Sequence, residues 1–171
     1  MNKYVFKPYN PIFVELFNGE KERLSKYLTG NYRIEHAGST AVPGLGGKGI
    51  IDIFIAAPKK DLEKISNELI KAGYEYRLTG SKLVGHLYFR IDLQDPLEGV
   101  RRYHIHLNNY EAKDFQQAVA LRDYLRKHSE EAKKYVEVKK RAIEEGKQDT
   151  YSYTGAKNPI IQEMLKRASK K

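Results

Sequence analysis

The residue types best suited to chemistry in this sequence lie in one glycine-rich segment. Gly38-Ser39-Thr40 follows a short stretch that predicts a strand, and Lys48 lies further along the same loop. Gly38 permits a tight turn, and successive amides together with the hydroxyls of Ser39 and Thr40 can surround a phosphate. Lys48 would neutralise the phosphate charge. The segment therefore predicts a phosphate-binding turn, although turn chemistry alone also explains a Gly-Ser pair.

The next element, Ile50 to Ala57, is dense in Ile and Phe and predicts a buried strand that carries Asp52. An unpaired carboxylate inside a strand is costly, so it is usually ligated to a metal, paired with a base or placed at a sheet end facing a cleft. The structural alternative is that Asp52 caps or bridges its surroundings. A strand, a Gly-Ser turn and a second strand with an embedded Asp together indicate site chemistry, which makes Asp52 a catalytic and metal-binding candidate.

Two histidines supply further candidates for catalysis and metal binding. His104 and His106 alternate on one predicted strand, so both imidazoles project from the same face. Neutral imidazole is a good ligand for zinc and other transition metals and a poor one for magnesium. The pair could instead bind an anion or shuttle protons near neutral pH. The structural alternative is a polar, exposed sheet face.

Basic residues in the C-terminal third could contact phosphate. Arg122 and Arg126 share a helix face at i, i+4 spacing, where they either clamp a phosphate or pair with Asp123 and Glu130 on a solvated face. Lys157 is equally open to both interpretations.

Several other polar residues have two interpretations each. His36 either contacts the site or stabilises the turn, and Asp92 is expected to pair across strands with Arg101 or Arg102 rather than to hold a metal. Tyr151 and Tyr153 either stack on a base or pack against the sheet. We do not expect His86 or His128 to bind a metal.

These residues need a sheet to bring them together, and the hydrophobic pattern predicts one. One helix is expected from Asn10-Pro11 to Thr29-Gly30 and another from Asp61 to Gly73. The predicted strands are Tyr32–Ala37, Ile50–Ala57, Tyr74–Leu78, His86–Leu93 and Arg101–Leu107.

The second part of the chain has a different pattern. Residues 111–145 contain no Pro or Gly, and His128-Ser129 divides this segment into two predicted helices. After a polar stretch, a last helix is expected from Asn158-Pro159. The predicted fold class is α+β: a mixed sheet flanked by helices over residues 1–110, followed by a helical C-terminal part over residues 111–171, in a single domain.

The composition excludes several kinds of site and several classes of protein. The 171 residues include no Cys, which excludes disulfides, thiolate metal sites and a cysteine nucleophile. No apolar run approaches the ~20 residues of a membrane span, and the first residues lack the apolar region of a secretory leader. We therefore expect a cytoplasmic protein that does not bind membranes.

The net charge is +9, and the excess is spread over both parts of the chain. A positive field favours anionic partners such as nucleotides or phosphorylated metabolites. Nucleic-acid binding ranks last, because neither a basic stripe interleaved with exposed aromatics nor a known motif is present. The oligomeric state is left open.

The stretch from His36 to Ile53 resembles the signature of the bacterial GrpB family, which is grouped with the nucleotidyltransferase superfamily. The similarity continues through Tyr9–Phe17, His104-Ile105-His106, Leu121–Arg126 and Tyr153–Ile161. This resemblance implies a nucleotidyltransferase-like mixed sheet whose Gly-Ser turn opens onto the phosphates of a nucleotide. It also implies that Ser39 contacts a phosphate and that Asp52 holds a divalent cation, with Mg, Mn or Zn as candidates.

The sequence departs from that superfamily in one respect. Classical members place two carboxylates two residues apart on the strand after Gly-Ser, so that both hold metal on one face. Here Ile50 and Phe54 occupy the positions available to a mate of Asp52. We expect a protein that binds a nucleotide or phosphorylated small molecule. It either carries out metal-dependent nucleotidyl or phosphate-group transfer or, having lost the carboxylate pair, serves as a non-catalytic binding module.

Overall fold

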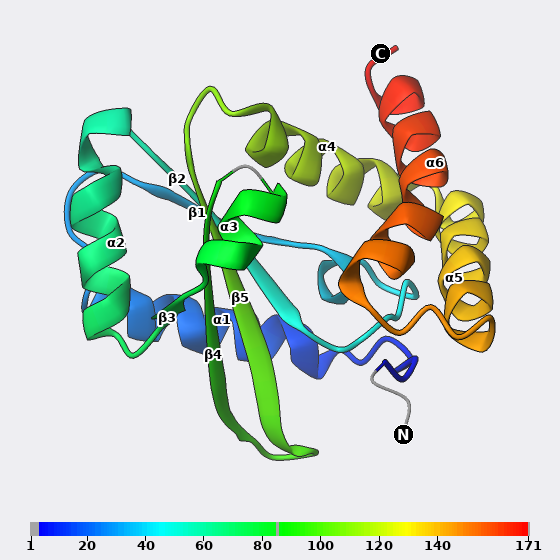
Figure 1. Cartoon of the computed structure of the whole chain (residues 1–171), viewed down its shortest axis with the longest axis horizontal. Helices are drawn as coiled ribbons and strands as arrows, with labels where there is room; N and C mark the ends of the chain where they lie inside the picture. Colours follow the sequence, from blue (N-terminus) through cyan, green and yellow to red (C-terminus); the bar gives the residue numbers. More distant parts are fainter. Residues whose placement is uncertain (1–3, 85, 171) are drawn as a thin grey trace.

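The computed structural model describes residues 4–84 and 86–170, so the expectation about a leader rests partly on residues outside this range. Among the described residues, no helix combines the length and apolar character that crossing a membrane requires. The elements, shown in Figure 1, are α1 (Ile12–Ser25), β1 (Arg33–Ala37), η1 (Ser39–Ala41), β2 (Ile51–Ala57), η2 (Lys59–Asp61), α2 (Leu62–Lys71), β3 (Glu75–Tyr76), α3 (Leu78–Val84), β4 (Leu87–Asp95), β5 (Gly99–Asn109), α4 (Lys113–Lys127), α5 (Ser129–Glu144) and α6 (Thr150–Ala168).

The strands form one mixed five-stranded sheet in the order β1-β2-β5-β4-β3. The central pair, β2 and β5, is parallel, and the other neighbouring strands are antiparallel. The parallel register sets Asp52 beside His104 and Phe54 beside His106. Because side chains alternate along a strand, these four residues lie on one face of the sheet. The predicted mixed α+β sheet is confirmed.

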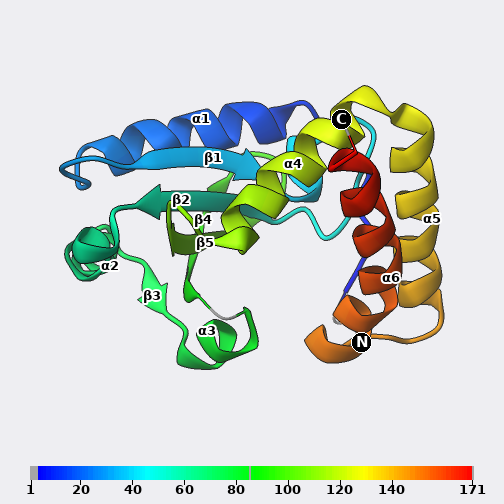
Figure 2. The same cartoon turned by 90° about the horizontal axis from the view of Figure 1, so that it is seen from above.

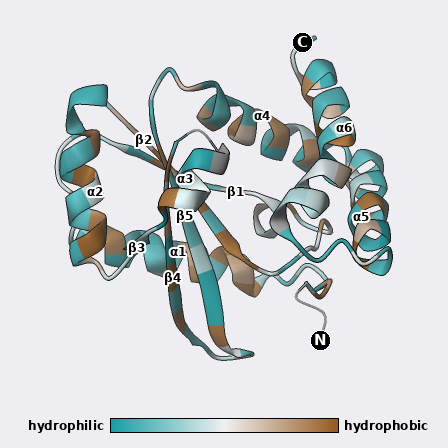
Figure 3. Cartoon of the chain, in the orientation of Figure 1, coloured by the Kyte–Doolittle hydropathy of each residue, from teal (hydrophilic) through white to brown (hydrophobic). Residues whose placement is uncertain are grey.

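The opposite face of the sheet carries the main hydrophobic core. Ile53 and Ile55 of β2 and Ile105 of β5 are fully buried there. The core-facing side of α1 adds Phe13 and Leu24, and α2 packs against the same cluster. In Figure 3, apolar and polar segments alternate along β5 and within the helices, as this two-sided arrangement requires. The core therefore leaves the other face free for polar chemistry.

Three helices follow the sheet, as predicted for the C-terminal part. α4 contacts β1, β2 and β5, while α5 and α6 lie side by side at one end of the molecule, away from α2 (Figure 2). A second cluster joins Leu125 of α4, Tyr135 of α5 and Met164 of α6 to Val42 and Leu45 of the glycine-rich loop. This packing holds α5 and α6 against the loop that precedes β2.

Two predicted elements have the wrong bounds. The last helix begins at Thr150 and not at Asn158, because Asp149 caps it by accepting a bond from the amide of Ser152 at 2.9 Å and because Tyr153 packs into a buried cluster. Pro159 lies inside this helix.

The strand predicted over Tyr74–Leu78 is reduced to Glu75–Tyr76. Tyr74 turns into the core, where its hydroxyl donates to Glu20 at 2.8 Å. On the other side, Leu78 begins α3, a helix that was not predicted. Burial of one end residue and the start of a helix at the other leave only two residues for strand pairing.

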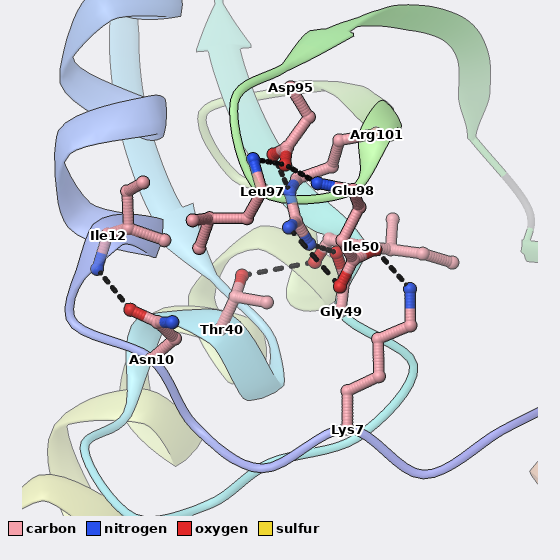
Figure 4. Close-up of polar contacts among 10 residues, drawn as sticks. All are labelled: Lys7, Asn10, Ile12, Thr40, Gly49, Ile50, Asp95, Leu97, Glu98 and Arg101. Atoms are coloured by element: carbon pink, nitrogen blue, oxygen red, sulfur yellow. Dashed lines mark hydrogen bonds and ion pairs between the residues drawn. The ribbon is translucent and has the colours of Figure 1, made fainter.

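A buried ion pair ties the glycine-rich loop to the β4–β5 hairpin (Figure 4). The side chains of Arg101 and Asp95 contact each other and are 2% and 0% exposed. Arg101 Nη1 also donates to the carbonyl of Gly49 at 2.7 Å. Asp95 accepts bonds from the amides of Leu97 and Glu98 in the hairpin turn. The pair therefore holds both the hairpin and the end of the loop that leads into β2.

Replacing Asp95 with Asn should lower the free energy of unfolding by about 3–5 kcal/mol, because the guanidinium of Arg101 would remain buried without its countercharge. Urea unfolding followed by circular dichroism would measure the loss. Asp92→Asn, which removes one partner of an exposed ion pair with Arg102, is the matched control and should cost about 1 kcal/mol or less. Equal, small losses in the two variants would contradict the structural role of Asp95.

Candidate functional site

A cavity of about 200 Å³ lies on the polar face of the sheet, between the glycine-rich loop, the start of β2, the middle of β5, and the helices α5 and α6. Its lining comes from both parts of the chain. The lining residues are Gly38, Ser39, Gly47, Lys48, Ile50, Asp52, His104, Tyr135, Lys139, Tyr153 and Lys157. Six of the predicted site residues, from the turn, both central strands and α6, are thus brought together.

The Gly-Ser turn is built around the carboxylate of Asp52. Gly38 follows β1 directly and has φ +74°. A Cβ atom at this position would lie 2.5 Å from Asp52 Oδ2, so only glycine allows the carboxylate to approach the backbone this closely. Gly47 plays a similar part, since a Cβ there would lie 2.7 Å from the hydroxyl oxygen of Ser39. The two glycines therefore make room for the polar groups of the cavity.

Both predicted histidines meet Asp52. His104 Nδ1 lies 3.5 Å and His106 Nε2 3.4 Å from Asp52 Oδ1. Burial alone would raise the pKa of the Asp52 carboxyl, but the hydrogen bond from His104 and the proximity of His106 outweigh burial and hold that pKa below its usual range. Burial lowers the pKa of His104, and Asp52 opposes that effect in part. The cluster therefore favours an ionised carboxylate beside a neutral imidazole.

The donor atoms of this cluster suit a divalent cation. One ligand atom from each of Asp52, His104 and His106 lies within 4.8 Å of the others. Nitrogen and oxygen ligands at about 2.1 Å from a tetrahedral metal are about 3.4 Å apart, which matches the two separations above. Two imidazoles and one carboxylate favour zinc, manganese or another transition metal over magnesium.

Phe54 occupies the position where a second carboxylate would project from β2. Its ring stacks on the imidazole of His106, with centroids 4.2 Å apart and planes at 8°. Tyr88 of β4 contacts both His104 and His106, at centroid distances of 5.0 and 5.2 Å. These aromatic contacts fix the orientation of the imidazole rings. The rings surround a single carboxylate, that of Asp52, whereas a two-metal site needs more than one carboxylate.

Three lysines line the cavity, and two of them, Lys48 and Lys157, lie over the ring of Tyr153. Lys48 Nζ lies 5.1 Å and Lys157 Nζ 4.4 Å from the centre of that ring. Lys139, from α5, is only 2% exposed and donates to the carbonyl of Gly46. Like charges gathered around a small cavity repel one another, so an anion bound among them would be stabilised.

The environment weakens the proton affinity of two of these lysines. Burial, and then the charge of Lys157, lowers the pKa of Lys139 to about 7. Burial, and then the charge of Lys48, lowers the pKa of Lys157 to about 8. An anion in the cavity would favour the charged ammonium forms and reverse part of this effect.

Thr40 does not line the cavity, although it was predicted to bind phosphate. It is 1% exposed, and its hydroxyl donates to the carbonyl of Ile50 at 3.1 Å and contacts His36 Nε2 at 2.9 Å. His36 stacks on Phe17 and is buried, which lowers its pKa to about 4. Both residues therefore make contacts that stabilise the turn, and neither lines the cavity.

Arg122 and Arg126 also lie outside the cavity lining, in contrast to their predicted phosphate role. Arg122 forms ion pairs with Glu35 and Asp123 and donates to the carbonyl of His36 at 3.0 Å. Arg126 Nε donates to the carbonyl of Ala41 at 2.9 Å. The two arginines bind the backbone on either side of the Gly-Ser turn and so hold it against α4.

The structure also places three further candidate residues. Asp92 pairs with Arg102, as expected, and Tyr151 is 85% exposed, whereas Tyr153 is buried at the cavity. Lys139 and Tyr135 were missed, because their spacing in α5 is that of an ordinary amphipathic helix. Lys139 does lie one turn after Tyr135, on the apolar face, and that is the signal that could have identified it.

Comparisons with known proteins agree with this architecture. A family model described as GrpB protein matches residues 3–167. The glutamate-rich protein GrpB of Alkalihalophilus pseudofirmus is 33% identical over 153 residues, which cover 88% of this chain and 87% of that protein. A UPF0157 protein of Halalkalibacterium halodurans is 30% identical over 164 residues, covering 94% of this chain and 80% of the relative.

Solved structures show the same fold. The crystal structure of the conserved protein GrpB from Enterococcus faecalis has a TM-score of 0.77 and 28% identity, covering 97% of this chain and all of that one. The Cid1 poly(U) polymerase bound to MgGTP has a TM-score of 0.54 and 17% identity, covering 80% of this chain and 44% of the polymerase chain. The second likeness shows that the fold is nucleotidyltransferase-like, as predicted.

If the cavity binds phosphate, Lys139→Met should weaken that binding by about 10- to 100-fold, because a buried charge-assisted hydrogen bond to the phosphate would be lost. Its midpoint of thermal unfolding without anion should not fall, since removing a buried ammonium offsets the lost bond to Gly46. Isothermal titration with inorganic phosphate and a thermal melt would test both points. Lys133→Met, on the exposed side of the same helix, is the control and should bind like the unaltered chain. Equal affinities in the two variants would exclude Lys139 from the site.

If an anion binds among these lysines, its affinity should fall as the pH rises from about 6 to about 9. The ammonium forms of Lys139 and Lys157 attract the anion, and these forms are lost above pKa values of about 7 and about 8. Sulfate is a suitable probe for isothermal titration, because it stays a dianion throughout this range. An affinity that is flat over this range in the unaltered chain would show that neither lysine contributes charge to binding.

Proposed function

The chain belongs to the GrpB family, and we propose that it binds a nucleotide or another phosphorylated small molecule in the cavity above Asp52. In this proposal the hydroxyl of Ser39 and the ammonium groups of Lys48, Lys139 and Lys157 bind the phosphates. The cavity volume of about 200 Å³ suits phosphate groups, with the remainder of the molecule outside.

One observation carries this proposal: the buried ammonium of Lys139 is directed at the cavity beside Ser39. A Cβ atom built on Gly47 would lie 2.7 Å from Ser39 Oγ and 3.3 Å from Lys139 Nζ, so both groups reach the same small space. Burying a lysine without a carboxylate partner costs stability, and a ligand phosphate would supply the missing countercharge. The aromatic ring of Tyr153 offsets part of the cost for the other two lysines.

A divalent cation on Asp52, His104 and His106 belongs to the same proposal, because the donor atoms and their spacing suit one. When bound, it would polarise a phosphoryl oxygen and neutralise charge on the transferred group. The chain itself orients the phosphates through the turn and the lysines. With a single carboxylate on β2, the site favours phosphate-group or nucleotidyl transfer assisted by one cation.

The cavity also leads us to propose that residues 1–171 act as one functional unit. Its floor comes from the sheet and its far wall from α5 and α6. Neither the first 110 residues nor the helical part alone would hold a phosphate in this way. The C-terminal helices would therefore be part of the site.

A second candidate function is a non-catalytic module that binds nucleotides or anions. Phe54 favours this candidate, because it stands where a second carboxylate would project and stacks on His106. A module of this kind would keep phosphate affinity in excess chelator and show no turnover. Nucleic-acid binding remains the least favoured interpretation, since Tyr151 is the one aromatic side chain among the described residues that is mostly exposed.

The two candidates differ in their response to metal and to Asp52→Asn. Thermal shift of the full chain with ATP, in manganese, cobalt, zinc or chelator, would measure the binding. A ligand at 100 times its Kd adds about 2.7 kcal/mol to stability, which such a shift detects. For cation-assisted chemistry, we expect manganese or zinc to strengthen ATP binding and Asp52→Asn to abolish that gain.

Without a cation, Asp52→Asn should bind ATP at least as well as the unaltered chain, because a carboxylate that repels phosphate has been removed. Asp92→Asn is the charge-matched control on β4 and should respond to metal normally. Product analysis by phosphorus NMR then separates transfer from binding alone. A chain that shifts neither with ATP nor with inorganic phosphate in any metal would refute the proposed phosphate site.

A further inference from the structure

His86 lies directly behind His106, on the side away from Asp52. His86 Nε2 is 2.8 Å from His106 Nδ1, and His86 Nδ1 is 3.2 Å from Asp114 Oδ2. The three residues come from separate elements: His86 precedes β4, His106 is in β5 and Asp114 is in the first turn of α4. With Asp52 they form a continuous row of side chains from the cavity to the surface.

The positions of the protons in this row follow from its outer end. An ionised carboxylate only accepts hydrogen bonds, so Asp114 requires a proton on His86 Nδ1. In a neutral ring, His86 Nε2 then carries a lone pair and accepts from Nδ1 of His106. A neutral His106 in turn presents the lone pair of its Nε2 toward Asp52 Oδ1, 3.4 Å away.

That arrangement places two acceptors against each other, a lone pair of His106 and a carboxylate oxygen of Asp52. Such a pair is unfavourable in a partly buried site unless a positive charge lies between the two atoms. The side chains of His106 and Asp52 are 13% and 24% exposed, so water screens them only in part. This arrangement therefore leaves the Nε2 lone pair of His106 available to a cation beside Asp52.

We propose that His86 and Asp114 are positioning residues that select the metal-binding tautomer of His106. The inference rests on the proposed cation site and adds the residues behind one of its ligands: Asp114 orients His86, and His86 orients His106. Hydrogen bonds of this kind fix the ring and raise its basicity toward a metal. The stacked ring of Phe54 holds the plane of His106, while His86 sets the protonation of the nitrogen that faces Asp52.

Cobalt binding to the full chain tests this inference without any assay of activity. Cobalt(II) would be titrated into the unaltered chain, Asp114→Ala and His86→Phe, and its visible absorption would report affinity and nitrogen ligation. We expect both variants to bind about 10- to 100-fold more weakly. Asp114→Asn should fall in between, because its amide oxygen still accepts from His86 without a charge. Glu111→Ala removes a nearby exposed carboxylate and should leave the affinity unchanged.

Nitrogen NMR of the zinc-loaded chain gives a second readout. We expect the proton of His106 on Nδ1 in the unaltered chain, with slow exchange that becomes fast in His86→Phe. A proton on Nε2, or cobalt affinities of Asp114→Ala and His86→Phe equal to that of the unaltered chain, would overturn this inference alone. Failure of the unaltered chain to bind cobalt or zinc would overturn the proposed cation site and this inference with it.

Discussion

The candidate site depends on one constraint, the parallel pairing of β2 with β5 at the centre of the sheet. This pairing joins Asp52 to His104 and Phe54 to His106, although α2, β3, α3 and β4 separate the two strands in the chain. A slip of one residue in either strand would turn its polar side chains into the core that α1 and α2 cover. Burial of Ile53, Ile55 and Ile105 on the other face therefore enforces the geometry of the polar face. The apolar core and the site are two consequences of one register.

Buried positive charges lie near the Asp52 carboxylate, and burying them costs stability. The buried Arg101–Asp95 pair anchors the loop, and Arg122 and Arg126 bind the backbone of the turn, so these charges have partners and act on structure. Lys139 is different, because its described contacts are a backbone carbonyl and the face of Tyr135. A buried ammonium with such partners is a costly choice for stability alone, and it is the kind of feature that binding of an anion explains.

The sequence predicted those parts of the site that depend on local pattern. Alternation along a strand is enough to set His104 and His106 on one face. The order of a Gly-Ser turn followed by a strand with Asp52 is enough to predict that the turn and this carboxylate lie near each other. Arg122, Arg126 and Thr40 were assigned to phosphate because their chemistry allows it, but the backbone carbonyls of the turn compete for the same donors. His86 could not be recognised, since its partners His106 and Asp114 come from elements that only the tertiary fold brings close. Lys139 leaves one local signal, its position on the apolar face of α5 one turn after Tyr135. The late start of the last predicted helix had a local cause, because Asp149 caps a segment whose Tyr, Ser, Thr and Gly residues favour turns.

The likeness to the poly(U) polymerase concerns the fold alone, and β2 carries one carboxylate where a two-metal site has two. In two-metal transfer, a second carboxylate from the same strand face shares the charge of two cations. Phe54 fills that place, and the imidazoles of His104 and His106 offer nitrogen ligands instead of oxygen. Each difference favours a single transition metal over magnesium, because imidazole binds magnesium poorly and one carboxylate neutralises too little charge for two ions. In the proposed function, the three lysines that line the cavity would provide the positive charge that a second cation supplies in two-metal sites. The turn would then still bind phosphates, while part of their neutralisation would come from the protein instead of a metal.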